Sequence, residues 1–587
     1  MLLPRRPAIA LTALIQGLCL LALHLVLESR AWPTADLFWA IPLYVLALVV
    51  PATFNILCGE FPRSRALAGG LALGALIALT GLWFGWSGVT PVDSAMERYS
   101  LFADVLVFGA SSVCVWFIAL PFLQGALRMQ RLSFPYPHLF DDVWRNAQVL
   151  SNALLFAAGF WLLLGLWAGL FAVLRIDFFQ ELFTSPKFAY PATSLVMGLA
   201  IALEDHRTPL LSGLRTQLLG LQTRLLPLAA VILLLFLAAL PFTGLQPLWD
   251  TGHATPLMLC LQFALLLLVN AAWQDGERPA PFSRQTQTLI RLALLTLPVL
   301  AALCAWSLSL RLRQYGWTVD RVWAVILVSL ASLSGLAYAA CASRPGWLPG
   351  LGRYNTGIVL ILLAALLAVH SPLLDPRRIS AASQLQRLLS GRVDSEHFDY
   401  DYLRFDLGRA GQEALHQLAR LSGHPSAAAI QAKAREALAR KARYGWNTDT
   451  TPESLLTRLQ IHPPGAMPDP AFGEYLSGRI NRDKEHRDYL LSSLRGTTPI
   501  ILLAIDLGND PGLEYVLLSP PYLVFTREPD GWRQVGQLQF QGIPPSPSEV
   551  EKSLANRDYG VEPRRWNDLK LGGRIGSLLL LPAKSEH

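Results

Sequence analysis

Charged residues are scarce in this chain. Only 16% of its 587 residues are Asp, Glu, Lys or Arg, and 52% are hydrophobic, whereas a soluble domain usually carries about 25% charged residues. The shortage lies in residues 1–370, which hold 22 of the 49 Lys and Arg and 16 of the 42 Asp and Glu. It excludes an ordinary soluble domain there and predicts a membrane protein. Arg in loops at a lipid surface explains the positive excess, so we expect the lipid bilayer and no nucleic acid as partner.

Cysteine is absent from the tail, defined here as residues 371–587. The tail therefore has no disulfide and no thiolate metal site. The six cysteines lie in or beside apolar runs, where a lone cysteine usually serves as a small packing residue. They are Cys19, Cys58, Cys114, Cys260, Cys304 and Cys341.

Familiar catalytic motifs are also missing. The chain has no Gly-x-Ser-x-Gly, His-Glu-x-x-His, P-loop or Cys-x-x-Cys, so we assign no catalytic or cofactor-binding residue. A membrane enzyme that acts on a lipid-linked substrate through scattered Arg and Asp stays open as a third hypothesis.

Ionisable groups within the apolar runs are few, with His24 and Asp104 as the candidates. Ion-coupled transporters usually place carboxylates or basic groups along their pathway. A secondary transporter therefore suits the number of runs but not their composition. A lone His on an apolar helix is more often a packing residue.

What the sequence does contain is a series of apolar runs of about 20 residues, each long enough to cross roughly 30 Å of hydrocarbon as a helix. They cover residues 8–27, 37–57, 66–86, 101–123, 149–174, 188–203, 225–242, 254–273, 289–310, 322–341 and 354–369. The expected fold is an α-helical polytopic membrane protein of about eleven transmembrane helices with a C-terminal α+β soluble domain.

The distribution of basic residues predicts the orientation. With eleven spans and a cytoplasmic N-terminus, 15 of the 22 Lys and Arg of residues 1–370 lie inside, as the positive-inside rule requires. Without the short run 188–203 only 10 would lie inside. We expect an uncleaved first span rather than a signal peptide. The protein would then lie in a bacterial inner membrane, with the tail in the periplasm.

The loop of residues 311–321, called loop 311–321 below, carries Arg on the outer face, where Arg is least expected. Its candidate interaction residues are Arg311, Arg313, Tyr315, Trp317 and Arg321. They are interpreted either as lipid anchors, or as a site that docks the tail or holds an anionic ligand. An acidic cluster early in the tail offers docking partners: Asp394, Glu396, Asp399, Asp401 and Asp406.

The tail changes character near residue 499. Residues 371–498 form an expected extracytoplasmic helical region, with helices at 379–390, 399–421, 426–443, 452–460 and 483–494. Residues 499–587 form an expected small β-rich region, with strands at 500–505, 514–518, 522–526, 532–540 and 577–581 and a hairpin turn at Asp530 and Gly531.

Oxygen ligands recur at every fourth position between the first two of these strands, as Asp506, Asp510 and Glu514. Calcium loops use such a spacing. Gly508 and Pro511 depart from the calcium pattern, so an ordinary acidic β-turn is the alternative. Calcium is the one metal or cofactor that the sequence suggests.

Several stretches resemble a bacterial family of multi-span membrane proteins catalogued as domain of unknown function 4153. They are residues 136–144 with Asn146, 248–252 with 270–276, 313–318 with Arg321, and 374–380 with 401–408. The resemblance implies an inner-membrane protein of unassigned role and brings no catalytic residues.

These observations favour a non-catalytic envelope protein that presents a periplasmic domain to a ligand or to an envelope protein partner. A secondary transporter or permease is the alternative. The sequence predicts neither the ligand nor the oligomeric state.

Overall fold

The computed structural model describes most of the chain. The described residues are 5–29, 31–34, 36–88, 95–131, 134–203, 209–251, 253–277, 279–440, 452–463, 469–482, 500–507, 512–518, 522–529, 531–538, 547–561, 569–571 and 574–576. The expected helix at 483–494, the expected strand at 577–581 and Asp530 of the expected turn lie outside them.

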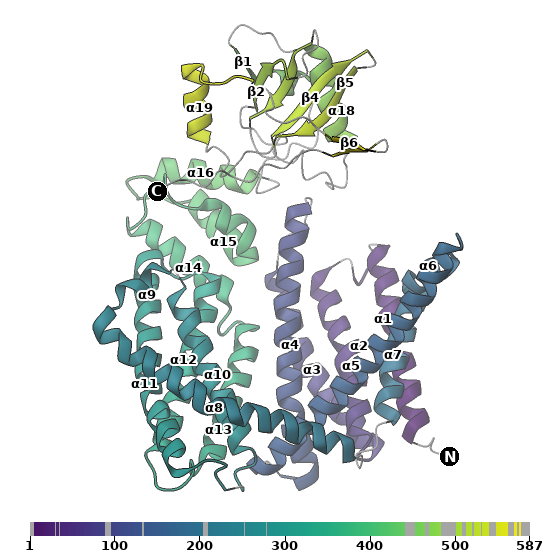
Figure 1. The fold of residues 1–587 in the computed structure, drawn as a ribbon, viewed down its shortest axis with the longest axis vertical. Helices are drawn as coiled ribbons and strands as arrows, with labels where there is room; N and C mark the ends of the chain where they lie inside the picture. The colour runs from purple at the N-terminus through teal and green to yellow at the C-terminus, as the bar shows by residue number, and fades with distance from the viewer. Residues whose placement is uncertain are drawn as a thin grey trace. The chain divides into compact units, whose positions relative to one another are not determined.

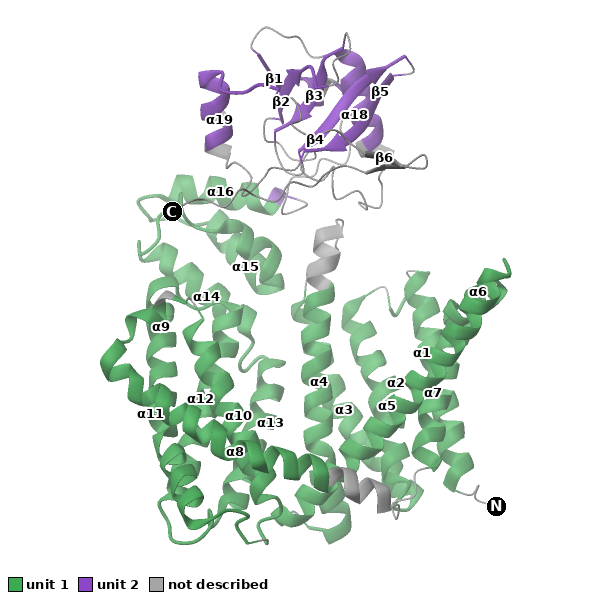
Figure 2. Ribbon diagram, viewed as in Figure 1, with its two compact units in different colours: residues 1–91, 100–438 green, residues 92–99, 439–587 purple. Residues whose placement is uncertain are grey.

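The chain forms two compact units (Figure 2). Unit 1 comprises Met1–Pro91 and Ser100–Leu438, and unit 2 comprises Val92–Tyr99 and Ala439–His587. The first helices of the tail thus belong to the unit that holds the spans, whereas the expected division placed a boundary at residue 370.

All eleven expected spans are helices of sufficient length and hydropathy to cross a membrane, so the polytopic fold is confirmed (Figure 1). They are α1 (Arg5–Glu28), α2 (Leu37–Leu57), α3 (Arg63–Ser87), α4 (Ala95–Met129), α5 (Tyr136–Val173), α7 (Pro186–Leu203), α8 (Pro209–Thr243), α10 (Ala254–Trp273), α11 (Arg284–Tyr315), α12 (Val319–Ala342) and α13 (Leu351–Val369). Two short helices, α6 (Phe178–Thr184) and α9 (Gln246–Asp250), lie between spans.

The short span α7 is held by close packing on α1. A Cβ at Gly17 would lie 2.6 Å from the Cα of Pro191. A Cβ at Gly198 would overlap the Cβ of Ala13. Small residues let two helix backbones approach closely in a membrane. This contact explains why an 18-residue helix with a proline inside it forms a span.

The spans form two bundles, and α13 contributes to the apolar cores of both, with Leu351 in one and Leu366 in the other. The N-terminal bundle is built from α1–α5 and α7, and its core includes Ile77 of α3 and Leu120 of α4. The C-terminal bundle is built from α8 and α10–α13, and its core includes Leu265 of α10 and Leu294 of α11. Figure 1 shows the two groups of helices on opposite sides of unit 1.

A buried hydrogen-bond network joins the bundles at the end of the spans far from the tail. Asn355 of α13 donates to Asn270 of α10 over 2.6 Å and to the Tyr136 hydroxyl of α5 over 3.4 Å. Tyr338 of α12 donates to the Asn355 side-chain oxygen over 2.7 Å. Because each polar group has a partner, the network is stable in an apolar setting.

A charged network at the same end ties the helices of the N-terminal bundle together. Arg128 of α4 makes two hydrogen bonds of 3.1 Å to the two carboxylate oxygens of Asp142 in α5. Arg145 contacts both Asp142 and Glu60. Asp142 is only 4% exposed, so its charge depends on these two guanidinium groups.

The first part of the tail is helical, as expected. It contains α14 (Pro376–Leu389), the π-helical turn η1 (Tyr402–Asp406), α15 (Gly408–Ala419) and α16 (Ala427–Ala439). The expected helix at 399–421 is broken at Gly408. This residue has φ +53°, and a Cβ there would lie 2.5 Å from the Ser87 carbonyl oxygen of α3. Only glycine fits that conformation at so close an approach.

Unit 2 is an α+β fold, which confirms the expected class of the C-terminal region. Its elements are α17 (Pro452–Leu456), β1 (Leu459–His462), α18 (Pro470–Arg482), β2 (Ile500–Ile505), β3 (Glu514–Leu517), β4 (Leu523–Glu528), β5 (Gly531–Gln537), α19 (Pro547–Asn556), β6 (Leu569–Leu571) and β7 (Arg574–Gly576).

Five strands of unit 2 form one sheet in the order β1-β2-β3-β4-β5. β1 runs parallel to β2, with Leu459 opposite Ile500, and the remaining pairs are antiparallel. Phe472 of α18 is buried in the core on one face. Val550 of α19 packs with Val516 on the other face. β1 begins before residue 499 and was not expected from the sequence.

Candidate functional site

A cavity of about 1590 Å³ lies between the two bundles of unit 1. Its walls come from the C-terminal ends of α3, α11 and α13, from the N-terminal halves of α4, α10 and α12, and from the start of α14. These helix ends all lie on the side from which the tail leaves α13, which we call the tail side. The cavity is larger than the roughly 300–1,000 Å³ typical of pockets for small molecules.

The cavity extends into the apolar part of the spans. On α4 it is lined from Asp104 to Cys114, an axial distance of about 15 Å at 1.5 Å per residue. That is roughly half of a 30 Å hydrocarbon core. The inner walls carry Leu259, Phe263 and Leu327. The site therefore combines an apolar interior with charged groups at its tail-side rim.

Helix α14 closes part of this rim and is tied to the N-terminal bundle. Arg377 contributes a 2.7 Å ion pair to Asp104 of α4, with side chains 10% and 35% exposed. The Trp83 indole N–H of α3 donates to Asp375 over 3.1 Å. Asp375 also caps the helix, because its other oxygen accepts the Arg377 backbone N–H at 2.9 Å. Asp104, Asp375 and Arg377 all line the cavity.

The same helix is tied to the C-terminal bundle through loop 311–321. The Trp317 backbone N–H donates to the Ser383 hydroxyl at 3.1 Å. The Trp317 carbonyl accepts from Ser380 at 3.2 Å and from Gln384 at 2.9 Å. Arg387 donates to the Gln314 carbonyl at 2.9 Å. The predicted contact between loop and tail is therefore present, and the loop contributes backbone groups to these hydrogen bonds.

Three carboxylates of the acidic cluster bond within the tail. Asp394 pairs with His397 at 2.7 Å, and Glu396 pairs with Lys433 at 2.9 Å. The backbone N–H and imidazole of His397 hold the pKa of Asp394 below its usual value. Asp399 accepts the Tyr402 backbone N–H at 2.8 Å. For these three carboxylates the expected ion pairs with loop 311–321 are replaced by local partners.

The structure brings together candidates that the sequence suggested for separate reasons. Asp104, Arg311, Tyr315 and Arg321 all line the cavity. Asp104, considered as a residue of an ion pathway, is engaged by Arg377 of α14.

The other candidates lie elsewhere. His24 pairs with Glu28 at 3.2 Å and packs on Tyr190. Arg313 is exposed and does not line the cavity. Trp317 is held by α14 through its backbone. None of these three contributes a side chain to the cavity wall.

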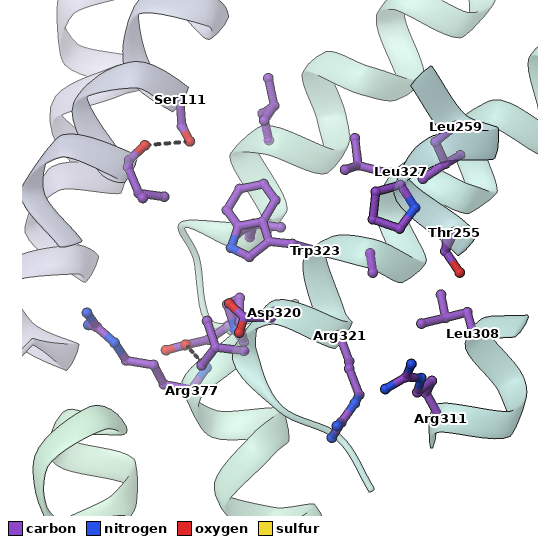
Figure 3. A pocket seen from close by; sticks show the side chains of 18 of the residues that line it. Ser111, Thr255, Leu259, Leu308, Arg311, Asp320, Arg321, Trp323, Leu327 and Arg377 are labelled. Atoms are coloured by element: carbon purple, nitrogen blue, oxygen red, sulfur yellow. Dashed lines mark hydrogen bonds between the residues drawn. The ribbon is translucent and has the colours of Figure 1, made fainter. Parts of the chain in front are cut away.

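Two positive side chains share one side of the rim. Figure 3 shows Arg311 and Arg321 reaching into the same space, with Asp320 and Arg377 farther along the rim. Arg321 donates to the Gly316 carbonyl at 3.0 Å, and its guanidinium lies 5.1 Å from the centre of the Tyr315 ring. Asp320 lies in the first turn of α12, where the helix dipole stabilises a carboxylate.

His370 is a lining residue that the sequence did not single out. Its ring packs on Phe108 of α4 and Trp323 of α12, at centroid distances of 5.1 and 6.0 Å. Its Nε2 atom is buried and has no hydrogen-bond partner among the described residues. Burial, and then the positive charge of Arg377, lower the pKa of His370 to about 4. The imidazole is therefore neutral at physiological pH. No local pattern marks a histidine that follows the last span as a wall residue.

The predicted calcium loop is described only in part, because Asp510 lies outside the described residues. Glu514 is 5% exposed. Its carboxylate accepts the Leu507 backbone N–H at 2.6 Å and the Thr526 hydroxyl at 3.4 Å. It thereby holds the β2–β3 connection against β4. Within the described part of the chain, no three His, Cys, Asp or Glu residues are grouped as metal ligands, and calcium binding stays a prediction.

Two curated proteins share a short similarity with the chain. Both are named thiol:disulfide interchange protein DsbD and come from Neisseria meningitidis strains of serogroups A and B. Each is 31% identical over 83 residues, which is 14% of this chain and 13% of the relative. The match thus spans a small part of their length. No family model matches the chain, and no solved structure matches it.

Proposed function

We propose that this polytopic membrane protein binds an amphiphilic molecule in the cavity between its two bundles. The observation that carries the proposal is the form of the cavity: about 1590 Å³, apolar inside and charged at the tail-side rim. An acyl chain suits walls such as Leu259, Phe263 and Leu327, because burial there removes apolar surface from water. A polar head suits the rim, where Arg side chains and carboxylates offer hydrogen bonds.

The proposal is tested by filling the cavity. Ala110 of α4 lines it, whereas the exposed Val113, one turn away on the same helix, does not. We expect the purified wild-type protein to retain co-purified lipid in native mass spectrometry. Ala110→Trp should lose that lipid, and the matched control Val113→Trp should keep it. Equal lipid retention by Ala110→Trp and wild type would contradict the proposal.

We further propose that the N-terminus is cytoplasmic and that the tail is periplasmic. The support is the charge distribution, with 15 of 22 basic residues on the proposed inner side. Alkaline phosphatase fused after His587 should then be active, and a cytoplasm-dependent fluorescent protein at the same place should stay dark. Membership of the domain of unknown function 4153 family stays a prediction.

Thiol–disulfide exchange is a second candidate, for one reason. Cys114 of α4 and Cys260 of α10 are free thiols that line the cavity from the two bundles, and the partly similar proteins are named for this chemistry. A disulfide would require the Cα atoms of Cys114 and Cys260 to come within about 4.4–6.8 Å of each other. Mild oxidation of the protein in vesicles, followed by peptide mass spectrometry, tests it. A Cys114–Cys260 disulfide would favour exchange, and two separately alkylated thiols would oppose it.

A further inference from the structure

We infer that the head of the amphiphile is an anion and that Arg321 is its main contact. The inference rests on the proposed function, since it names the chemical class that the cavity takes. The class is a phosphate-type oxyanion, in the form of an anionic lipid headgroup or of free phosphate.

Most of the charges at the rim are committed to partners in the protein. Asp104 and Arg377 form an ion pair. Asp375 accepts hydrogen bonds from the Trp83 indole and from a backbone N–H of α14. Asp320 is placed at the positive end of the α12 dipole. A cation would have to compete with these partners for each carboxylate.

Arg321 differs from these charged residues, because neither its described hydrogen bond nor its ring contact involves a carboxylate. It is half-buried, donates one N–H to the Gly316 carbonyl and lies over the Tyr315 ring. A guanidinium has five N–H donors in a fixed fork that matches the oxygens of a phosphate. Since Arg321 lines the cavity, its other donors are available to a ligand there.

Arg311 strengthens the positive potential at this place. It has contacts of its own, yet its charge lies beside that of Arg321 at the rim (Figure 3). An anion bound to Arg321 is therefore also attracted by the charge of Arg311. Loop 311–321 as a whole carries three Arg against one Asp.

The backbone around Arg321 is fixed in advance. Gly316 has φ +73° and packs against the Arg387 side chain of α14. The neighbouring Trp317 is hydrogen-bonded to α14 on both its N–H and its carbonyl. The carbonyl that orients Arg321 is therefore held by the helix that borders the cavity. A pre-positioned guanidinium loses less freedom when it binds an anion.

The experiment compares lipids of equal chain length that differ in the head. The full-length protein is equilibrated in micelles that contain equal amounts of phosphatidylglycerol and of diacylglycerol, which has no phosphate, and the retained lipid is counted by native mass spectrometry. Wild type should retain phosphatidylglycerol preferentially. Arg321→Gln should lower the ratio of the two lipids about tenfold, the size expected for a lost hydrogen bond to a charged group.

Two further variants separate the possible causes. Arg321→Lys keeps the charge and should retain part of the preference, which also guards against a folding defect in Arg321→Gln. Arg313→Gln removes a charge from the same loop outside the cavity and should behave as wild type. An unchanged ratio in Arg321→Gln, or an equal fall in Arg313→Gln, would overturn the inference.

The Ala110→Trp variant separates this inference from the proposed function. If both lipids are retained equally by wild type and lost by Ala110→Trp, the cavity binds amphiphiles and the anion inference is wrong. If Ala110→Trp retains lipid, the proposed function is wrong. Inorganic phosphate identifies the source of the anion. If phosphate alone raises the melting temperature of delipidated wild type but not of Arg321→Gln, the anion inference holds for free phosphate.

Discussion

The ion pair between Asp104 and Arg377 should hold α14 over the rim of the cavity. The perturbation is a double-mutant cycle with Asp104→Asn, Arg377→Gln and the double variant. The Arg377 guanidinium also lies 5.5 Å from the centre of the Phe84 ring. The cycle isolates the ion pair, because that ring contact is lost equally from both Arg377 variants.

The magnitude follows from the exposure of the two side chains. An exposed ion pair contributes about 0.2–1 kcal/mol, whereas breaking a fully buried pair costs about 3–5 kcal/mol. Arg377 is 10% exposed and Asp104 is 35% exposed, which places this pair between the two cases. We expect a coupling energy of about 1–2 kcal/mol. The exposed pair of Arg409 and Glu413 is a matched comparison and should give about 0.5 kcal/mol or less.

Two measurements check this prediction. The free energy of unfolding in mixed micelles gives the coupling energy. Modification of Cys114, kept as the sole thiol, by a water-soluble maleimide reports access to the cavity wall. A loss of about 1 kcal/mol raises the population of the open state about fivefold. Because Cys114 is already exposed in the closed state, Asp104→Asn should speed its modification by at most that factor. Coupling no larger than that of Arg409 and Glu413, with unchanged Cys114 labelling, would refute the reasoning.

Two other predictions concern stability. Asp142→Asn should lower the free energy of unfolding by about 2–3 kcal/mol. It removes the more buried of the two carboxylates that Arg128 and Arg145 share and leaves them only Glu60 of that pair. The exposed neighbour variant Asp141→Asn should cost much less in the same thermal unfolding assay. The pKa of His370 is about 4 in the folded protein and about 6.5 when unfolded, so the unfolded state binds more protons as pH falls from about 6.5 to 4. The free energy of unfolding should therefore decrease over this window by at most about 3 kcal/mol. The part of this decrease that disappears in His370→Gln is the contribution of the His370 imidazole.

The spans were predictable because hydropathy is a local property. Each of the eleven runs is long enough to be recognised without knowledge of its neighbours. Strands β2 to β5 were predictable for a similar reason, since short apolar runs bounded by turn residues and a hairpin leave a local pattern. β1 was not, because a four-residue strand that pairs in parallel with β2 across about 40 residues carries no such signal.

The cavity was not predictable, because its walls come from the ends of helices that are far apart in the chain. Asp104 stood out as a rare carboxylate in a span, and Arg321 as an unexpected charge on the face predicted to be the outer one. Nothing in either local pattern places the two residues on one rim. Asp375 and Pro376 do carry a readable signal, since Asp at the cap followed by Pro in the first turn marks the start of a helix.

The two sides of α14 are held in different ways, and this asymmetry determines where the rim opens. Toward loop 311–321, four side chains of α14 reach backbone groups of the loop, including both polar groups of Trp317.

Toward the N-terminal bundle, α14 relies on the Asp104 ion pair, one indole hydrogen bond and the contact of Arg377 with the Phe84 ring. The next helix adds the stacking of Arg409 on Trp86 at 4.3 Å. Opening on the loop side would break several part-buried hydrogen bonds to loop backbone groups, each worth about 0.5–1.5 kcal/mol. Opening on the other side breaks side-chain contacts whose groups can turn to water or to a ligand. We therefore expect α14 and loop 311–321 to move as one body, so that Arg321 keeps its geometry while the seam along α3 and α4 opens.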